Sequence, residues 1–186
     1  MGNRLTKIFT KKGDDGTTDL GGNKRVEKFD SQIIVYGDLD ELSAAIGLIT
    51  CQENIPSDIQ AFLQSAQQEM FNISGELSAP EFKSVDEKKV ASIEEFIDRV
   101  NENLPPLKEF IVPGEEIRSA HTHMARAICR RAERSLVKLS KERSINPFSL
   151  KYLNRLSDAF FVIARLLARE SSENETLWKH ERVKKE

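Results

Sequence analysis

Hydrophobic residues recur every three or four positions along most of the chain, which is the spacing of an amphipathic helix. Five such stretches lie after Asp38, after Ser57, after Ser84, from about Glu115 to Arg143, and from Pro147 to near Glu170. The segment 32–36 (QIIVY) has the composition of a strand, but no second strand is predicted to pair with it. The pattern predicts an all-α fold: a five-helix bundle preceded by an N-terminal glycine-rich loop.

Capping residues and prolines mark the boundaries of these helices. The predicted N-terminal pairs are Asp38 with Glu41, Ser84 with Glu87, and Asn146 with Pro147. Between the third and fourth helices, the segment 102–114 (ENLPPLKEFIVPG) contains prolines that a helix interior does not tolerate, so we expect an ordered connector. We expect a single domain, with the loop segment at 1–30, the bundle at 38–170 and a polar tail at 171–186.

The last two helices each combine an apolar stripe with a polar face. The predicted core stripes are Ile117, Met124, Ile128 and Leu139 on the fourth helix, and Leu153, Leu156, Phe160, Ile163, Ala164 and Leu167 on the fifth. The other faces carry Arg126, Arg130 and Glu133, flanked by His123, and then Asn154, Asp158, Phe161 and Arg165. A solvated face or a buried polar network would show the same residue types. The arginine-rich run CRRAER (129–134) instead favours contacts with phosphate or carboxylate groups.

Glycines are concentrated near the N-terminus, in TKKGDDGTTDLGGNKRVEK (10–28). Glycine lets backbone N–H groups approach an anion closely, the neighbouring threonines and lysines add hydroxyl groups and positive charge, and Asp14 could hold a metal-bound water. The segment therefore predicts a triphosphate-binding loop, with a flexible surface loop as the alternative. It is not a Walker A loop, because Gly22-Asn23 stands where that motif requires Lys-Ser/Thr.

Composition and charge exclude several classes of protein. The 186 residues carry 28 Lys+Arg against 30 Asp+Glu, and this net charge of −2 argues against a general nucleic-acid binder. No apolar run approaches the ~18 residues of a membrane span, so we expect no membrane partner. Cys51 and Cys129 lie far apart without paired spacing, which excludes a disulfide framework or a zinc site and suits a reducing cytoplasm.

Five motifs in a fixed order resemble a known family. They are TKKGDDGTTDLGG, YGDLDELSAAIG, FIVPG, HMARAICRRAER and YLNRLSDAFFVIAR, which span Thr10 to about Arg169. The chain thereby resembles the single-domain ATP:cob(I)alamin adenosyltransferases, or corrinoid adenosyltransferases. The resemblance implies a ferritin-like bundle, a homotrimer with active sites between subunits, and transfer of the 5′-deoxyadenosyl group of ATP to the cobalt of cob(I)alamin with release of triphosphate. It also implies Mg²⁺, a flavin-type reductant and an adenosylcobalamin-dependent enzyme as partners.

The same resemblance implies roles for individual residues. The implied ATP-binding set is Thr10, Lys11, Gly13, Asp14, Gly16, Thr17, Thr18 and Lys24 in the loop, with Arg130, Glu133 and Asn154 on the last two helices. Glu133 is the implied Mg²⁺ ligand, and the implied corrinoid-binding set is Phe110, His123 and Asp158. Phe110 matches the aromatic residue beneath the corrin that displaces the lower axial ligand of cob(II)alamin. Arg126 matches the arginine of an intersubunit salt bridge with Asp40, and these two complete the implied catalytic set with Phe110.

One position departs from the family pattern. Members often have Pro-Gly-Gly after the phenylalanine, whereas this chain has Pro113-Gly114-Glu115. A glutamate in place of a glycine near the corrin face is expected to alter corrinoid fit more than ATP binding.

Two alternatives from other classes stay open. A corrinoid carrier without transferase activity would not need the ATP loop. A ferritin-like metal bundle would need a glutamate three residues before a helical histidine. The residues at that spacing from His121 and His123 are Arg118 and Ala120, so the sequence does not favour the metal bundle.

Overall fold

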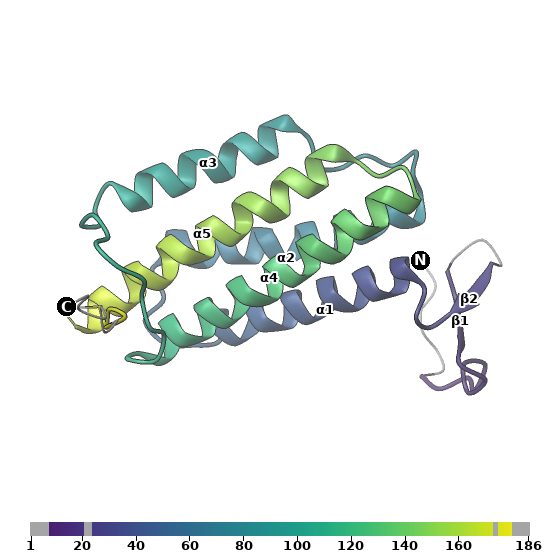
Figure 1. Cartoon of the computed structure of the whole chain (residues 1–186), viewed down its shortest axis with the longest axis horizontal. Coiled ribbons are helices and arrows are strands. Elements are labelled where there is room, and N and C mark those ends of the chain that lie inside the picture. The colour runs from purple at the N-terminus through teal and green to yellow at the C-terminus, as the bar shows by residue number, and fades with distance from the viewer. Residues whose placement is uncertain (1–7, 21–23, 173–174, 180–186) are drawn as a thin grey trace, which may run out of the picture.

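The computed structural model describes residues 8–20, 24–172 and 175–179. Over these residues the chain forms five helices and a two-stranded antiparallel sheet (Figure 1). The elements are β1 (Thr17–Asp19), β2 (Arg25–Glu27), α1 (Ser31–Thr50), α2 (Ser57–Ser78), α3 (Glu87–Asn101), α4 (Ile117–Glu142) and α5 (Pro147–Ser171). The predicted all-α bundle is confirmed, and the short sheet is an addition within the glycine-rich segment. Gly21, Gly22 and Asn23, and parts of the predicted tail, lie outside the described residues.

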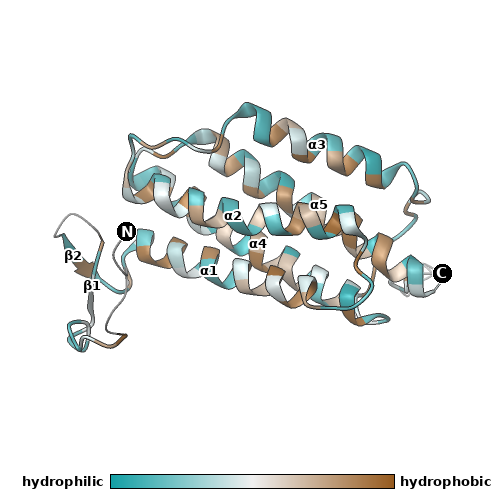
Figure 2. Ribbon diagram, turned by 180° about the vertical axis from the view of Figure 1, so that it is seen from behind, coloured by the Kyte–Doolittle hydropathy of each residue, from teal (hydrophilic) through white to brown (hydrophobic). Residues whose placement is uncertain are grey.

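The five helices pack around one apolar core. α1 packs between α2 and α4, α4 packs against α5, and α5 also packs against α3. Each helix carries both apolar and polar residues along its length, as an amphipathic helix does (Figure 2). The predicted stripe of α5 is confirmed, because Leu153, Leu156, Phe160, Ile163, Ala164 and Leu167 are all fully buried. No helix in the described part of the chain is long and apolar enough to span a bilayer.

The predicted core stripe of α4 is wrong in its N-terminal half. Ile117 and Met124 are 58% and 54% exposed, whereas Ile128 and Leu139 are buried as predicted. The inner face includes three small residues, Ala125, Cys129 and Ala132, beside Ile128, Leu136 and Leu139. Small side chains let α4 lie close to α1 and α5, and a pattern based on large apolar residues misses such a face.

The start of α1 also differs from the prediction. The helix begins at Ser31, and the side chain of Asp30 caps it by accepting a hydrogen bond from the backbone N–H of Gln32 (2.8 Å). Residues 32–36 are therefore helical, and the predicted cap Asp38 lies inside α1. Asp38 accepts hydrogen bonds from Arg131 Nε (2.9 Å) and Ser135 Oγ (2.5 Å) on α4. Asp38, which the spacing predicted to be a helix cap, instead joins α1 to α4 through these hydrogen bonds.

The other two predicted caps give one correction and one confirmation. α3 begins after Asp86, not Ser84, because the Asp86 side chain accepts a hydrogen bond from the backbone N–H of Lys89 (3.0 Å). At the start of α5, Asn146 accepts from the N–H of Phe148 (3.0 Å) and Pro147 is the first helical residue, as predicted.

Candidate functional site

A cleft of about 820 Å³ lies between the connector that follows α3 and the last two helices. The connector contributes Phe110, α4 contributes His123 and Arg126, and α5 contributes Asp158. The structure thus brings together all three residues of the predicted corrinoid-binding set, with Arg126 beside them. The volume falls in the range typical of sites for small molecules and cofactors, about 300–1,000 Å³.

Phe161 on α5 organises the helical wall of this cleft. Its ring makes an edge contact with His123, with the ring centroids 6.2 Å apart. The guanidinium of Arg126 lies over the same ring, 5.3 Å from its centroid, which is a cation–π contact. The sequence placed Phe161 on this face without a role. The structure shows that it contacts two of the predicted site residues.

Phe110 stands at the mouth of the cleft rather than in the core. Its residue is 76% exposed, so it does not anchor the connector to the bundle. Its carbonyl oxygen accepts a hydrogen bond from the backbone N–H of Trp178 (2.7 Å), and the two rings lie 6.3 Å apart. An exposed aromatic ring on a backbone held in this way is available to a ligand.

The titratable groups around the cleft are not arranged for nucleophilic catalysis. Burial and the positive charge of Arg126 lower the pKa of His123, while Glu175 partly opposes them, so the imidazole is neutral at neutral pH. The Cys129 thiol donates to the carbonyl oxygen of Leu153 (3.2 Å), and burial raises its pKa. A buried thiol of raised pKa is a poor nucleophile.

The α4 and α5 residues of the predicted ATP-binding set lie on the same helices as the cleft. Asn154 donates to Glu133 Oε1 (2.9 Å) and accepts from Arg155 Nη1 (2.6 Å), while Arg130 is exposed one turn beyond Arg126. This is the interhelical polar network considered as the alternative for Asn154. Because the network is only half-buried, its polar groups remain accessible to a nucleotide.

The glycine-rich segment is braced by its own side chains. Asp15 accepts from the backbone N–H (2.9 Å) and hydroxyl (2.8 Å) of Thr17, and these bonds lower the pKa of Asp15. Lys28 donates to the carbonyl oxygen of Gly13 (2.7 Å), and Arg25 donates to the Thr17 hydroxyl (3.0 Å from Nε). Gly16 has φ +88°, a conformation that favours glycine. Sequence reasoning missed the bracing by Asp15, Arg25 and Lys28; the Asp-Gly-Thr turn signal was available for Asp15.

The segment that holds the other residues of the predicted ATP-binding set lies apart from the two helices that hold Arg130, Glu133 and Asn154. β1 and β2 contact each other but none of the five helices. They project beyond the N-terminal end of α1, whereas the connector lies at the opposite end of the bundle (Figure 1). The structure therefore does not bring Lys11 or Gly13 to Arg130 and Glu133 within one chain.

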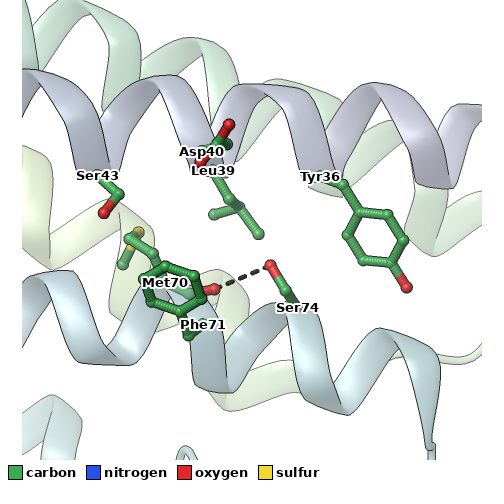
Figure 3. Close-up of a pocket in the computed structure, with 7 residues that line it drawn as sticks. All are labelled: Tyr36, Leu39, Asp40, Ser43, Met70, Phe71 and Ser74. Carbon is green, nitrogen blue, oxygen red and sulfur yellow. Dashed lines mark hydrogen bonds between the residues drawn. The ribbon is translucent and has the colours of Figure 1, made fainter. Parts of the chain in front are cut away.

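Asp40 lies in a different groove from its predicted partner. It belongs to α1 and is among the residues, with Tyr36 and Phe71, that line a hollow of about 40 Å³ between α1 and α2 (Figure 3), a volume that suits a side chain but not a nucleotide. Arg126 lines the cleft between α4 and α5, so the two residues do not form an ion pair within one chain.

Metal ligands are sparse in the described part of the chain. No group of three or more His, Cys, Asp or Glu side chains there is arranged to hold a metal ion. Glu133 is the carboxylate of the predicted ATP-binding set on α4, and it fits the common pattern in which Mg²⁺ takes one or two carboxylates and substrate phosphates.

Comparison with solved structures defines the class of protein. Two variants of a PduO-type ATP:corrinoid adenosyltransferase from Lactobacillus reuteri, each complexed with cobalamin and ATP, share the fold. One gives a TM-score of 0.85 at 34% identity and covers 93% of this chain and 97% of its own. The other gives 0.87 at 33% identity and covers 94% and 100%. The bundle is thus that of the PduO-type adenosyltransferases, a class of transferases.

Comparison with known sequences agrees and extends over nearly the whole chain. The family described as cobalamin adenosyltransferase matches residues 8–167. A cobalamin adenosyltransferase of Cupriavidus metallidurans is 43% identical over 182 residues, 98% of this chain and 99% of that protein. A corrinoid adenosyltransferase of Mycobacterium tuberculosis is 35% identical over 188 residues, 96% of each. The chain belongs to the cobalamin adenosyltransferase family, and the resemblance inferred from its motifs is confirmed.

Proposed function

We propose that this chain transfers the 5′-deoxyadenosyl group of ATP to the cobalt of cob(I)alamin, giving adenosylcobalamin and triphosphate. Cobalt is the nucleophile: a cobalt–carbon bond forms at C5′, the C5′–oxygen bond breaks, and its electron pair leaves with triphosphate. Family membership supports the reaction. The observation that carries it to this chain is the cleft in which Phe110, His123, Arg126 and Asp158 converge.

The protein contributes position and charge rather than a covalent intermediate. A neutral His123 and a buried Cys129 of raised pKa are consistent with that role. Phe110 is the residue that acts on the corrinoid, because its exposed ring can occupy the lower axial face of cob(II)alamin. Loss of an axial donor lowers the orbital that accepts the electron, which makes reduction to cob(I)alamin easier.

The nucleotide is held from two sides. The glycine-rich loop, with Thr10, Lys11 and Lys24, wraps the phosphates, and Arg130, Glu133 and Asn154 hold ATP from the helices. Glu133 would supply one carboxylate oxygen to Mg²⁺, with the remaining ligands from phosphates and water. When bound there, Mg²⁺ would neutralise charge on the leaving triphosphate.

A complete site requires a second copy of the chain. Within one chain the loop lies at the opposite end of the bundle from the cleft, and Asp40 and Arg126 line different grooves. Apolar side chains accompany both partners: Met124 on α4 is 54% exposed and Phe71 beside Asp40 is 65% exposed. A head-to-tail contact between two different surfaces forms a ring when the rotation between copies closes, and the homotrimer is the ring that we propose.

The proposed reaction and the cysteines suggest a cellular location and two partners. Both cysteines are unpaired, which suits a reducing cytoplasm. A flavin-type reductant would supply the electron for cob(II)alamin, and an adenosylcobalamin-dependent enzyme would use the product.

An anaerobic assay with ATP and chemically reduced cobalamin tests the proposal. We expect the visible spectrum of the cobalt–carbon product to appear together with one triphosphate per adenosylcobalamin, and neither to appear without ATP. Cobalamin binding without triphosphate release would instead identify a corrinoid carrier and overturn the transferase assignment.

A further inference from the structure

The segment that carries Phe110 is one strand of a small pairing with residues 175–178. Ile111 and Leu177 form an antiparallel bridge. The backbone N–H of Val112 donates to the carbonyl oxygen of Thr176 (2.8 Å), and that of Trp178 donates to Phe110 (2.7 Å). The tail was predicted to be a polar extension. In the structure its described residues instead fix the backbone at Phe110 and Val112, on the two sides of Ile111.

A buried ion pair holds this tail to α5. Arg165 donates from Nε to Glu175 Oε1 (2.8 Å) and from Nη2 to Glu175 Oε2 (3.1 Å), a bidentate geometry. The two side chains are only 4% and 6% exposed. Arg165 Nη2 also donates to the carbonyl oxygen of Pro105 (2.8 Å). One guanidinium thus holds the tail and the start of the connector at once.

We propose that the Arg165–Glu175 pair is a latch that positions Phe110 in the corrinoid cleft. Arg165 and Glu175 are then positioning residues for the reaction, acting through the backbone of the 110–112 strand. The expected effect on the reaction rests on the proposed function. The effect of the pair on the position of the tail can be tested without any activity.

The contacts of the latch indicate that the Arg165–Glu175 pair does more than stabilise the fold, because they lead to the backbone that carries Phe110. Arg165 extends the polar face of α5 that carries Asp158 and Phe161, but it reaches the tail and the connector rather than the cleft. The exposed ring of Phe110 has little packing of its own, so its position depends on the hydrogen bonds to residues 176 and 178. Glu115 adds a second tether, because it accepts a hydrogen bond from the Thr176 hydroxyl. The residue that departs from the family pattern therefore contacts the tail.

Trp178 provides a direct measurement of the latch. It is the single tryptophan of the chain, and it directly follows Leu177 of the strand bridge. We would compare the wild type with Glu175→Gln and Arg165→Met, measuring tryptophan emission and acrylamide quenching without ligands. KM for cob(I)alamin and KM for ATP would follow on the same preparations. Glu175 lies outside the bundle, so Glu175→Gln keeps the test available if Arg165→Met does not fold.

The latch predicts red-shifted, more quenchable Trp178 fluorescence in both variants. It also predicts a rise of about tenfold or more in KM for cob(I)alamin, the scale expected when a charge-assisted hydrogen bond is lost, with KM for ATP within about twofold. The control is Arg99→Met, which removes a surface ion pair with Asp58 and should change none of these values. Unchanged Trp178 fluorescence and unchanged KM for cob(I)alamin in a folded Glu175→Gln protein would overturn the latch. Absence of product from the wild type would instead overturn the proposed function and leave the fluorescence test valid.

Discussion

Asp40 and Arg126 lie in two different grooves of the same bundle, Asp40 between α1 and α2 and Arg126 between α4 and α5. Each groove exposes apolar surface beside the charge, through Phe71 in one and Met124 next to the other. The two charges can meet only if the grooves of two copies are brought together. Variants of these two residues therefore test whether copies of the chain assemble through the two grooves.

If the proposed trimer forms through this pair, Arg126→Ala and Asp40→Ala should each weaken it and lower activity. Removing one partner of a buried ion pair leaves the other charge unpaired, which costs about 3–5 kcal/mol. The double variant should lose less assembly free energy than the sum of the single variants. Sedimentation equilibrium of the four proteins gives the coupling free energy directly.

Arg99→Ala serves as the control for that cycle, because Arg99 pairs with Asp58 on the exposed surface and contacts neither groove. It should change the free energy of association by no more than a few tenths of a kcal/mol, because this exposed pair lies within one chain and such pairs contribute only about 0.2–1 kcal/mol to the stability of the fold. Strict additivity of Asp40→Ala and Arg126→Ala would show that the intersubunit pair does not exist.

The loop should become protected when MgATP binds. Lys11 and Lys12 are exposed, and the neighbouring strands contact no helix, so little of the bundle shields this segment. Phosphates held by the loop would order it against the helices of a neighbour. We expect trypsin to cleave after Lys11 and Lys12 more slowly with MgATP, while cleavage after the exposed loop residue Lys83 stays constant. Equal rates at the N-terminal sites would count against a nucleotide role for the loop.

His123 should make the protein less stable in mild acid. Burial and Arg126 lower its pKa in the folded state, whereas the unfolded chain keeps a value of about 6.5. Above that pH both states are neutral at this position. As pH falls below it, the unfolded state takes up a proton that the folded state resists, so the free energy of unfolding decreases. Urea unfolding at about pH 7.5 and 5.5 should show a smaller pH-dependent loss for His123→Gln than for the wild type, and equal losses would contradict the assignment.

The sequence predicted helices well where large apolar residues repeat, and less well where small or polar residues decide the packing. α5 followed its leucine and phenylalanine pattern closely. The inner face of α4 did not, because Ala125 and Cys129 carry little hydrophobic signal although both are fully buried. The start of α1 was missed for a different reason. Asp38 resembles a cap in sequence, and only the tertiary structure shows that it pairs with Arg131 instead.

In the candidate site, too, sequence motifs predicted some residues, whereas contacts made by tertiary packing were missed. The motifs predicted Phe110, His123 and Asp158, which the structure brings to one cleft. They did not predict Glu175, because the contact of the tail with Arg165 joins parts of the chain by tertiary packing alone. The sequence also did not predict that Lys11 lies apart from Arg130 and Glu133 within one chain, which is the reason for proposing that a second copy completes the site.

Phe110→Ala should separate binding of the corrinoid from its reduction. Phe110 is 76% exposed, so truncation should change the free energy of unfolding by no more than about 0.5 kcal/mol, as for other surface substitutions. Removing the ring leaves the lower axial ligand of cob(II)alamin in place, which keeps the electron-accepting orbital high. With a mild reductant and bound cob(II)alamin, activity should therefore fall by at least about a hundredfold, equivalent to about 2.7 kcal/mol of barrier. With cob(I)alamin supplied already reduced, the loss should be less than about tenfold. Phe82→Ala, a partly exposed phenylalanine far from the cleft, is the matched control and should behave as the wild type in both assays. If Phe110→Ala lost activity equally in both assays, the ring would act on corrinoid binding in general and not on the axial ligand.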